Sequence, residues 1–267
     1  MANESPPVSG SATFHAGADA YDRFMGRYSR PLATAFADRC LPSDAGTRFL
    51  DVGCGPGALT EVAVQRLGAS SVVAVDPTPG FVEAFRARHR GVEVHRAPAE
   101  HLPFAGGEFD AAAAQLVFHF VSDPERGAAE MARVVRPGGV VAACVWDFDE
   151  GMEMLRSFWD AALALDAQAP DEARTLRFGS PGELTALLRR AGLQHVAETT
   201  LTVHSTYADF DELWATFLLG IGPAGAYAAS RSPEEQAALR AELFGQLGRP
   251  AGSFDLRAVA RAARGTR

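Results

Sequence analysis

The chain has 267 residues, is 47% hydrophobic and carries a formal net charge of −8 at pH 7. This length and composition suit one sizeable α/β domain with insertions. The acidic balance argues against nucleic acid as a partner, because such a surface repels phosphate backbones. The three cysteines are widely spaced and include no CxxC pair. They form neither a metal-ligand pattern nor a disulfide framework, and they fit a reducing cytoplasm.

The N-terminal residues 1–17 are rich in Ser, Pro and Gly, and we expect this segment to be flexible. It lacks the charged and apolar regions of a secretory signal, and no apolar run reaches the roughly 18 residues that a membrane span needs. Residues 18–39 predict two helical pieces with a break near 29–31, because Pro31 suits a first helical turn.

Strand and helix patterns then alternate along the chain, which is typical of a parallel sheet with helices on both faces. The expected strands are 47–52, 71–76, 92–97, 109–117 and 140–146. The expected helices between them are 58–67, 80–90 and 124–135.

The rhythm changes after residue 147. An amphipathic helical stretch without strand signals comes first, and residues 180–183 then form a capping-box pattern that opens a further helix. A strand-like alternation follows at 196–207, then a second helical stretch, and 253–260 predicts a closing strand. We therefore expect six segments: a flexible N-terminus at 1–17, a ligand-binding core with N-terminal cap helices at 18–147, a helical lid insertion at 148–178, a continuation of the core at 179–207, a second helical insertion at 208–248, and a closing strand with tail at 249–267.

A glycine-rich loop follows the first expected strand. Gly53, Gly55 and Gly57 stand in the stretch DVGCGPGALT. Glycine permits positive φ and lets a ligand approach the backbone closely, and ligands of open parallel sheets bind beyond the strand ends. Asp76 ends the second expected strand, where a carboxylate can accept both hydroxyls of a ribose. Together these features favour an adenosine-type ligand.

The glycines alone leave NAD open, because Gly53, Gly55 and Ala58 also satisfy a relaxed dinucleotide pattern. Two details favour another ligand. Asp51 lies inside the strand before the loop, where it would repel a pyrophosphate but could hold an ammonium group. The short loop also suits something smaller than a diphosphate.

Five motifs follow one another within residues 50–139: LDVGCGPG, VVAVD, APAEHLPF, FD and RPGG. As an ordered set they resemble the motifs of class I S-adenosylmethionine-dependent methyltransferases, and more narrowly those of the bacterial small-molecule enzymes of the ubiquinone/menaquinone-biosynthesis-like group. The resemblance covers 18–147 well. It implies a Rossmann-like, seven-stranded, mostly parallel sheet with the last strand antiparallel, helices on both faces and a variable lid. It also implies in-line transfer of a methyl group from S-adenosylmethionine to an oxygen, nitrogen or carbon of a small, fairly apolar metabolite.

The resemblance implies a role for each matching residue. Gly53, Gly55 and Gly57, with Cys54 in the same loop, line the methionine part of the cofactor; Asp51 lies near its amino group, and Asp76 takes the ribose hydroxyls. The other implied cofactor residues are Pro77 and Phe81 on the adenine side, Ala99 and Glu100 beside the adenine ring, Gln115 and Leu116 beneath the methionine chain and sulfonium, and Tyr21, Met25, Arg27 and Arg30 on an N-terminal segment that folds over the cofactor.

Two of these positions leave alternatives. Pro98 stands where the family often has an acidic residue that binds the adenine amino group, so adenine recognition falls on backbone groups or on Glu100. Arg27 and Arg30 are equal candidates for a charge-assisted pair with the methionine carboxylate.

His119 is the candidate general base, since it follows the fourth expected strand in the stretch QLVFHFVSDP. A structural role is the alternative, because a histidine between two phenylalanines is commonly part of a core. Two other functions stay open: an NAD-dependent oxidoreductase, and a protein that binds S-adenosylmethionine without methylating. The sequence predicts no metal site and carries no signal for an oligomeric state.

Overall fold

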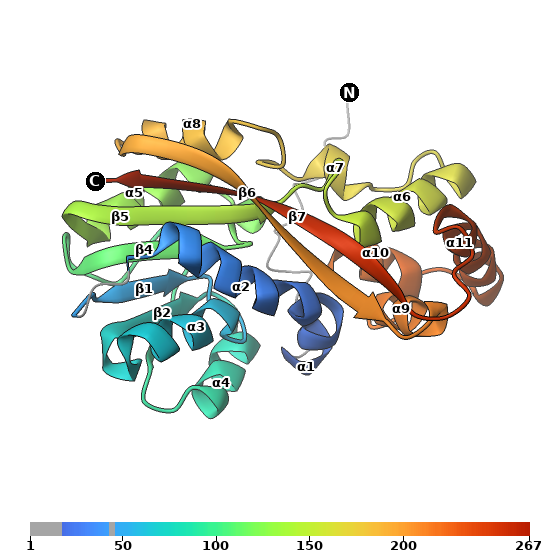
Figure 1. The fold of residues 1–267 in the computed structure, drawn as a ribbon, viewed down its shortest axis with the longest axis horizontal. Helices are drawn as coiled ribbons and strands as arrows, with labels where there is room; N and C mark the ends of the chain where they lie inside the picture. Colours follow the sequence, from blue (N-terminus) through green and yellow to red (C-terminus); the bar gives the residue numbers. More distant parts are fainter. Residues whose placement is uncertain (1–17, 43–45) are drawn as a thin grey trace, which may run out of the picture.

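The computed structural model describes residues 18–42 and 46–267; the segment 1–17, expected to be flexible, lies outside the described residues. Seven strands form one sheet in the order β3-β2-β1-β4-β5-β7-β6 (Figure 1). Strands β1 to β5 are parallel, and β7 runs antiparallel to both β5 and β6. The Rossmann-like sheet with an antiparallel last strand is therefore confirmed. The strands are β1 (Phe49–Val52), β2 (Val72–Asp76), β3 (Glu93–Arg96), β4 (Phe109–Gln115), β5 (Val135–Trp146), β6 (Gln194–Tyr207) and β7 (Phe254–Thr266).

Helices cover both faces of the sheet, because successive side chains of a strand point to opposite sides. In β1, Phe49 packs in one core cluster with α2 and α3, whereas Leu50 packs in another with α5 and α8. The helical segments are α1 (Ala18–Tyr21), the π-helical η2 (Asp22–Gly26), α2 (Arg27–Cys40), α3 (Ala58–Leu67), η3 (Ala69–Ser71), α4 (Pro79–Arg88), η4 (Phe118–Phe120), α5 (Pro124–Val134), α6 (Glu153–Leu165), α7 (Glu172–Thr175), α8 (Glu183–Arg190), α9 (Phe210–Phe217), α10 (Gly222–Ala229) and α11 (Pro233–Gln246).

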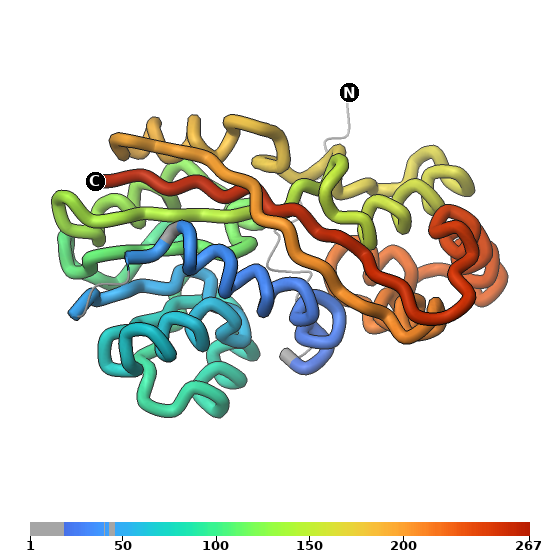
Figure 2. Tube along the Cα trace, viewed as in Figure 1, coloured from blue at the N-terminus to red at the C-terminus, as the bar shows by residue number. Residues whose placement is uncertain are grey.

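The two longest strands carry the sheet beyond its parallel part. β6 and β7 pair over most of their length and run diagonally to the end of the molecule where α9 and α11 lie (Figure 2). The segments expected as insertions contain α6 with α7 and α9 to α11. Phe158, Trp159 and Phe217 from these helices are fully buried in the first core cluster, so they pack the interior.

The expected break near Pro31 is wrong. Helix α2 runs unbroken through Pro31, and the irregular segment is η2, one turn earlier. Tyr28, Leu32 and Phe36 are completely buried. Their spacing of four residues puts them on one face of α2, so burial of that face holds the helix together across the proline.

Strand β5 begins at Val135, five residues before its expected start, and contains the RPGG motif. The register with β4 slips there: Phe109 lies opposite Val135, but Ala111 lies opposite Val140. A Cβ on Gly139 would stand 2.5 Å from the carbonyl oxygen of Asp110. This close approach explains the glycine at the bulge.

The expected capping box at 180–183 is only half formed. Glu183 accepts a hydrogen bond from the backbone N–H of Ser180, but α8 begins behind Gly182, and no side chain caps it. A complete box instead opens α11, where Ser232 and Glu235 satisfy each other's backbone N–H groups.

Candidate functional site

The glycine loop lies between β1 and α3, at the carboxyl ends of the parallel strands and beside the point where the strand order reverses between β1 and β4. The N–H groups of Gly53 and Cys54 both donate to the carbonyl of Val75, at 2.8 and 3.0 Å, and so fasten the loop to the end of β2. This edge of the sheet is where ligands of such folds bind.

Two glycines of the loop are required by their surroundings. Gly53 has φ +71°, and a Cβ there would stand 2.5 Å from Cγ2 of Val117. Gly57 has φ +104°, and a Cβ would lie 2.1 Å from Nε2 of His89. By contrast, a Cβ on Gly55 would meet nothing within 4 Å, so that position faces open space.

Asp76 closes the other side of the loop. One carboxylate oxygen accepts the N–H of Gly55 at 2.9 Å, and the other accepts the N–H of Thr78 at 2.8 Å. The residue is only 5% exposed. Burial raises the pKa of Asp76, although its backbone hydrogen bonds oppose the rise. Each oxygen has a further lone pair for a ligand hydroxyl.

Asp51 is a second buried carboxyl at the loop. It is 1% exposed and accepts a hydrogen bond from Oγ1 of Thr60 at 2.5 Å. Burial raises the pKa of Asp51 to about 7, and the nearby charge of Asp76 adds to the rise. A positively charged ligand group would compensate the cost of ionising this residue.

Three adjoining spaces with shared lining residues lie along this edge. The first, which we call the glycine-loop cavity, has a volume of about 190 Å³. Of the predicted cofactor residues, it is lined by Tyr21, Gly53, Gly55, Asp76, Pro77, Phe81, Ala99, Glu100, Gln115 and Leu116.

The second space, the deep pocket, lies behind the loop and is lined by Asp51 and Cys54. The third, the inner chamber, is lined by Met25 and His119 among mostly apolar residues. Tyr21 and Leu116 line all three spaces. Gly57 lines none of them and caps α3 instead.

Leu116 marks the junction of the three spaces with an unusual backbone. Its φ is +63°, a conformation that costs energy for a residue with a side chain and is common at functional sites. Its N–H donates to the carbonyl of Cys144 at 2.8 Å, which fixes the chain where β4 leaves the sheet.

Gln115 carries an unpaired acceptor into the site. Its Nε2 donates to the carbonyl of Ser29 at 2.9 Å, whereas its buried Oε1 has no hydrogen-bond partner among the described residues. Because a buried acceptor is normally satisfied, this oxygen suits a ligand donor.

Glu100 borders the cavity but is already engaged. Its Oε1 accepts the N–H groups of Ser122 and Asp123, at 3.1 and 3.2 Å, and so holds the turn before α5. One oxygen of Glu100 therefore stabilises the wall of the glycine-loop cavity and is less available to a ligand.

The structure does not bring Arg27 and Arg30 into any of the three spaces. Arg27 donates to Glu212 at 2.5 Å, and its guanidinium lies 4.0 Å from the ring centre of Tyr207. Arg30 is exposed and pairs with Asp22. Both arginines line a separate groove next to α9. The partners of Arg27 are distant in sequence, so its position could not be foreseen from the N-terminal segment alone.

His119 is buried at the wall of the inner chamber. Its Nδ1 donates to the carbonyl of Arg177 at 2.5 Å. Burial lowers the pKa of His119 to about 4, although the carbonyls of Arg177 and Trp146 favour the charged ring. His119 is therefore neutral at pH 7. Its Nε2 is buried and makes no hydrogen bond within the described structure.

Glu172 in the same chamber was missed by the sequence analysis. It is 3% exposed, and one of its oxygens accepts the indole N–H of Trp159 at 2.9 Å. Burial raises the pKa of Glu172 to about 7. The polar stretch APDEART around it carries no signal for a buried carboxyl.

In chemical terms, the first two spaces offer two buried carboxyls and an amide oxygen to one ligand. This set suits a ligand with positive charge and neighbouring hydroxyls. Across residues 18–42 and 46–267, no three His, Cys, Asp or Glu side chains gather into a possible metal site. The helices of the same residues include none long and apolar enough to cross a membrane.

Comparisons with known proteins give the site its context. A family model described as a methyltransferase domain matches residues 50–143. The malonyl-[acyl-carrier protein] O-methyltransferase of Geobacter sulfurreducens is 32% identical over 190 residues, which is 68% of this chain and 69% of that protein. The demethylmenaquinone methyltransferase of Clavibacter sepedonicus is 28% identical over 242 residues, covering 83% and 93%.

The fold agrees with a solved structure of a phosphoethanolamine N-methyltransferase from Haemonchus contortus. The TM-score is 0.59 at 16% identity, over 93% of this chain and 56% of that one. The comparisons give no support to the alternative of an NAD-dependent oxidoreductase. This sequence similarity, together with the strand order of the sheet, shows that the chain belongs to the class I S-adenosylmethionine-dependent methyltransferase family.

Proposed function

We propose that this protein binds S-adenosylmethionine in the glycine-loop cavity and deep pocket and methylates a small, fairly apolar metabolite. The observation that carries the proposal is the pair of buried carboxyls, Asp51 and Asp76, which border adjoining spaces behind one glycine loop. Two buried carboxyls whose pKa values are both raised, with the charge of Asp76 acting on Asp51, are costly for the protein by itself. A ligand with a cationic and a hydroxyl-bearing end would compensate both.

Each group has a role in holding the cofactor. Asp76 would accept the ribose hydroxyls with the lone pairs that Gly55 and Thr78 leave open. Asp51 would face the amino group of the methionine part, and Oε1 of Gln115 would accept one of its donors. Pro77 and Phe81 would border the adenine.

When bound, S-adenosylmethionine supplies a methyl group that is activated by a positively charged sulfur. The protein therefore has to orient the acceptor and exclude water, and orientation of this kind can contribute roughly 7–11 kcal/mol. Leu116, Phe120 and Val121 give the cavity an apolar wall for that task. A protein that binds the cofactor without methylating is the alternative outcome.

We also propose that the protein acts in the cytoplasm, since its three cysteines are widely spaced and include no CxxC pair, a pattern that fits a reducing compartment.

Isothermal titration of the purified protein with S-adenosylhomocysteine tests the proposal. We expect binding in the micromolar range, with NAD giving no heat under the same conditions. Absence of both heat and a thermal shift at millimolar S-adenosylhomocysteine would refute it. If the ligand binds, slow turnover with every acceptor offered would favour the non-methylating alternative.

A further inference from the structure

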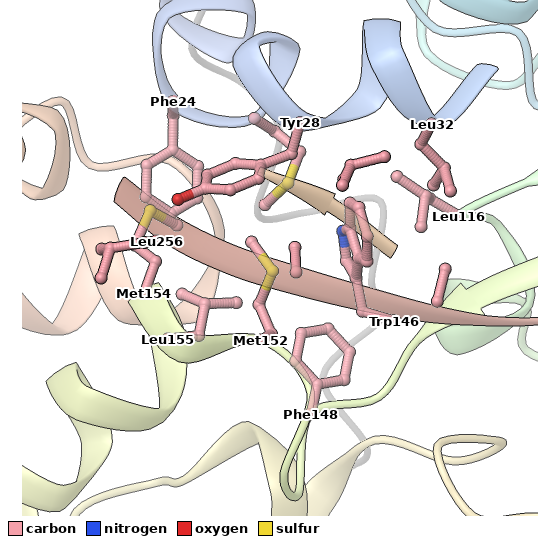
Figure 3. Close-up of a cluster of buried hydrophobic side chains, with 14 of the residues drawn as sticks. Phe24, Tyr28, Leu32, Leu116, Trp146, Phe148, Met152, Met154, Leu155 and Leu256 are labelled. Carbon is pink, nitrogen blue, oxygen red and sulfur yellow. The ribbon is translucent and has the colours of Figure 1, made fainter. Parts of the chain in front are cut away.

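The inner chamber adjoins the proposed cofactor site and differs from it chemically. Tyr21, Leu116 and Phe120 separate it from the glycine-loop cavity, because they line both spaces. Its remaining wall is mostly apolar and includes Phe24, Trp146, Phe148 and Leu155, which belong to one cluster of buried hydrophobic side chains (Figure 3). A flat, apolar molecule would suit such a wall.

The hydrogen bond of His119 decides what its ring offers to the chamber. A backbone carbonyl can only accept, so the Nδ1 atom that faces the Arg177 carbonyl must carry the proton. In the neutral ring, Nε2 then bears a lone pair. Since Nε2 is buried without a partner among the described residues, the chamber wall holds an unused hydrogen-bond acceptor.

Trp146 offers the complementary group. Its indole N–H is buried and also lacks a partner among the described residues. A buried donor left unpaired costs roughly 1–3 kcal/mol, and here it coincides with an unpaired acceptor in the same wall. Glu172 is less available, because it already accepts the N–H of Trp159.

One free donor and one free acceptor in an apolar wall define a simple ligand group. A hydroxyl is the smallest group that both donates and accepts a hydrogen bond. An ammonium group would leave the N–H of Trp146 unpaired, since it cannot accept. A carboxylate would have no cationic partner here and would lie in the same chamber as Glu172.

We propose that the inner chamber is the acceptor site of the methyltransferase and takes an uncharged aromatic alcohol of the phenol type. Its hydroxyl donates to Nε2 of His119 and accepts from Nε1 of Trp146. This inference rests on the proposed function, because the chamber can serve as an acceptor site only if the cofactor binds on the other side of the wall formed by Tyr21, Leu116 and Phe120. Glu172, which also lines the chamber, disfavours anionic acceptors because it is itself a carboxyl group.

The chamber must widen to admit a ring, since its volume in this structure is about 30 Å³, room for about one or two water molecules. One wall is formed by Phe24 and Met25 of the π-helical segment η2. Such segments interrupt regular helical hydrogen bonding and recur at functional sites. The ring therefore enters as η2 moves outward.

Binding of simple probes to the protein saturated with S-adenosylhomocysteine tests the proposal without turnover. Phenol, anisole, benzoate and benzylamine are titrated and followed by calorimetry. We expect phenol to bind at least about fivefold more tightly than anisole, which has the same ring but no hydrogen-bond donor. We also expect phenol to bind more tightly than benzoate and benzylamine, the two charged probes. Phenol no tighter than anisole, or benzylamine tighter than phenol, would overturn the inference.

Two variants test whether phenol binds in the inner chamber. Trp146→Phe removes the indole N–H, and His119→Asn removes Nε2 while its amide can still donate to the Arg177 carbonyl. Each should weaken phenol about five- to tenfold and leave anisole and S-adenosylhomocysteine unchanged. Phenol binding that neither variant alters would overturn the assignment of the chamber. If S-adenosylhomocysteine itself does not bind the wild-type protein, the proposed function fails, and this outcome is distinct from a failure of phenol alone.

Discussion

Replacing Asp51 by asparagine should stabilise the protein without its cofactor and weaken the cofactor at the same time. Burial raises the pKa of Asp51 from 3.8 to about 7. A shift of about three pH units corresponds to about 4 kcal/mol between the two protonation states. At pH 8 the folded protein carries this cost as an ionised, buried carboxylate. Asp51→Asn removes the charge and keeps an oxygen that can accept from Thr60.

The sign of the pH dependence follows from linkage. Because the folded pKa lies above the unfolded one, the stabilising contribution of protonated Asp51 is complete below about pH 4. It is lost as the pH rises toward about 7. The advantage of Asp51→Asn should therefore grow by about 2–3 kcal/mol between pH 5 and pH 7 and stay level above that. In a chain of this size we expect a gain in Tm of about 4–10 °C.

Thermal unfolding of the two proteins between pH 5 and pH 9, without ligand, measures this difference. Thr60→Val serves as a comparison variant, because it removes the hydrogen bond that lowers the pKa of Asp51. The pKa of Asp51 should then rise further, and the loss of stability that accompanies its ionisation should extend above pH 7. In parallel, S-adenosylhomocysteine should bind Asp51→Asn about tenfold or more weakly, as expected for a lost charged hydrogen bond. A stability difference independent of pH, or unchanged cofactor affinity, would refute the reasoning.

Three further changes probe the same region. Asp76→Ala should weaken S-adenosylhomocysteine by about 10- to 100-fold in calorimetry, since two charge-assisted hydrogen bonds are lost; an affinity within twofold of wild type would exclude a ribose contact. Gly57→Ala should destabilise the fold by about 1–3 kcal/mol because of its positive φ and the contact with His89. His89→Ala in the same chain should restore only part of that loss, and full restoration would argue against backbone strain. Glu172→Gln should gain stability over wild type in denaturant titrations as the pH rises from about 4.5 to about 7, where the buried carboxyl ionises; a gain that appears only at lower pH would contradict its raised pKa.

The sheet and the glycine loop could be predicted because local patterns determine them. The β-branched run that ends at Asp76 is buried on both faces of the sheet, so its hydrophobicity and its terminal carboxylate are both visible in the sequence. The glycines at 53 and 57 are likewise fixed by backbone conformation and close contacts. Such features depend on a few neighbouring residues or on one adjacent strand.

Other features depend on contacts between distant segments and left no local trace. Arg27 pairs with Glu212 across 185 positions. Glu172 lies in a polar stretch that predicts exposure, but the packing of α6 and α7 buries it against Trp159. The capping pattern at Ser180 failed for a different reason: Gly182, with φ +85°, starts α8 two residues late. The residues at 180–183 could form a capping box, but the backbone conformation at Gly182 prevents it.

A crystal structure of the protein with S-adenosylhomocysteine tests the central claim most directly. We predict the ribose hydroxyls within hydrogen-bond distance of Asp76, and the amino group of the ligand next to Asp51 and Gln115. A ligand bound outside the glycine-loop cavity, or Asp76 turned toward solvent with the ligand in place, would contradict the account.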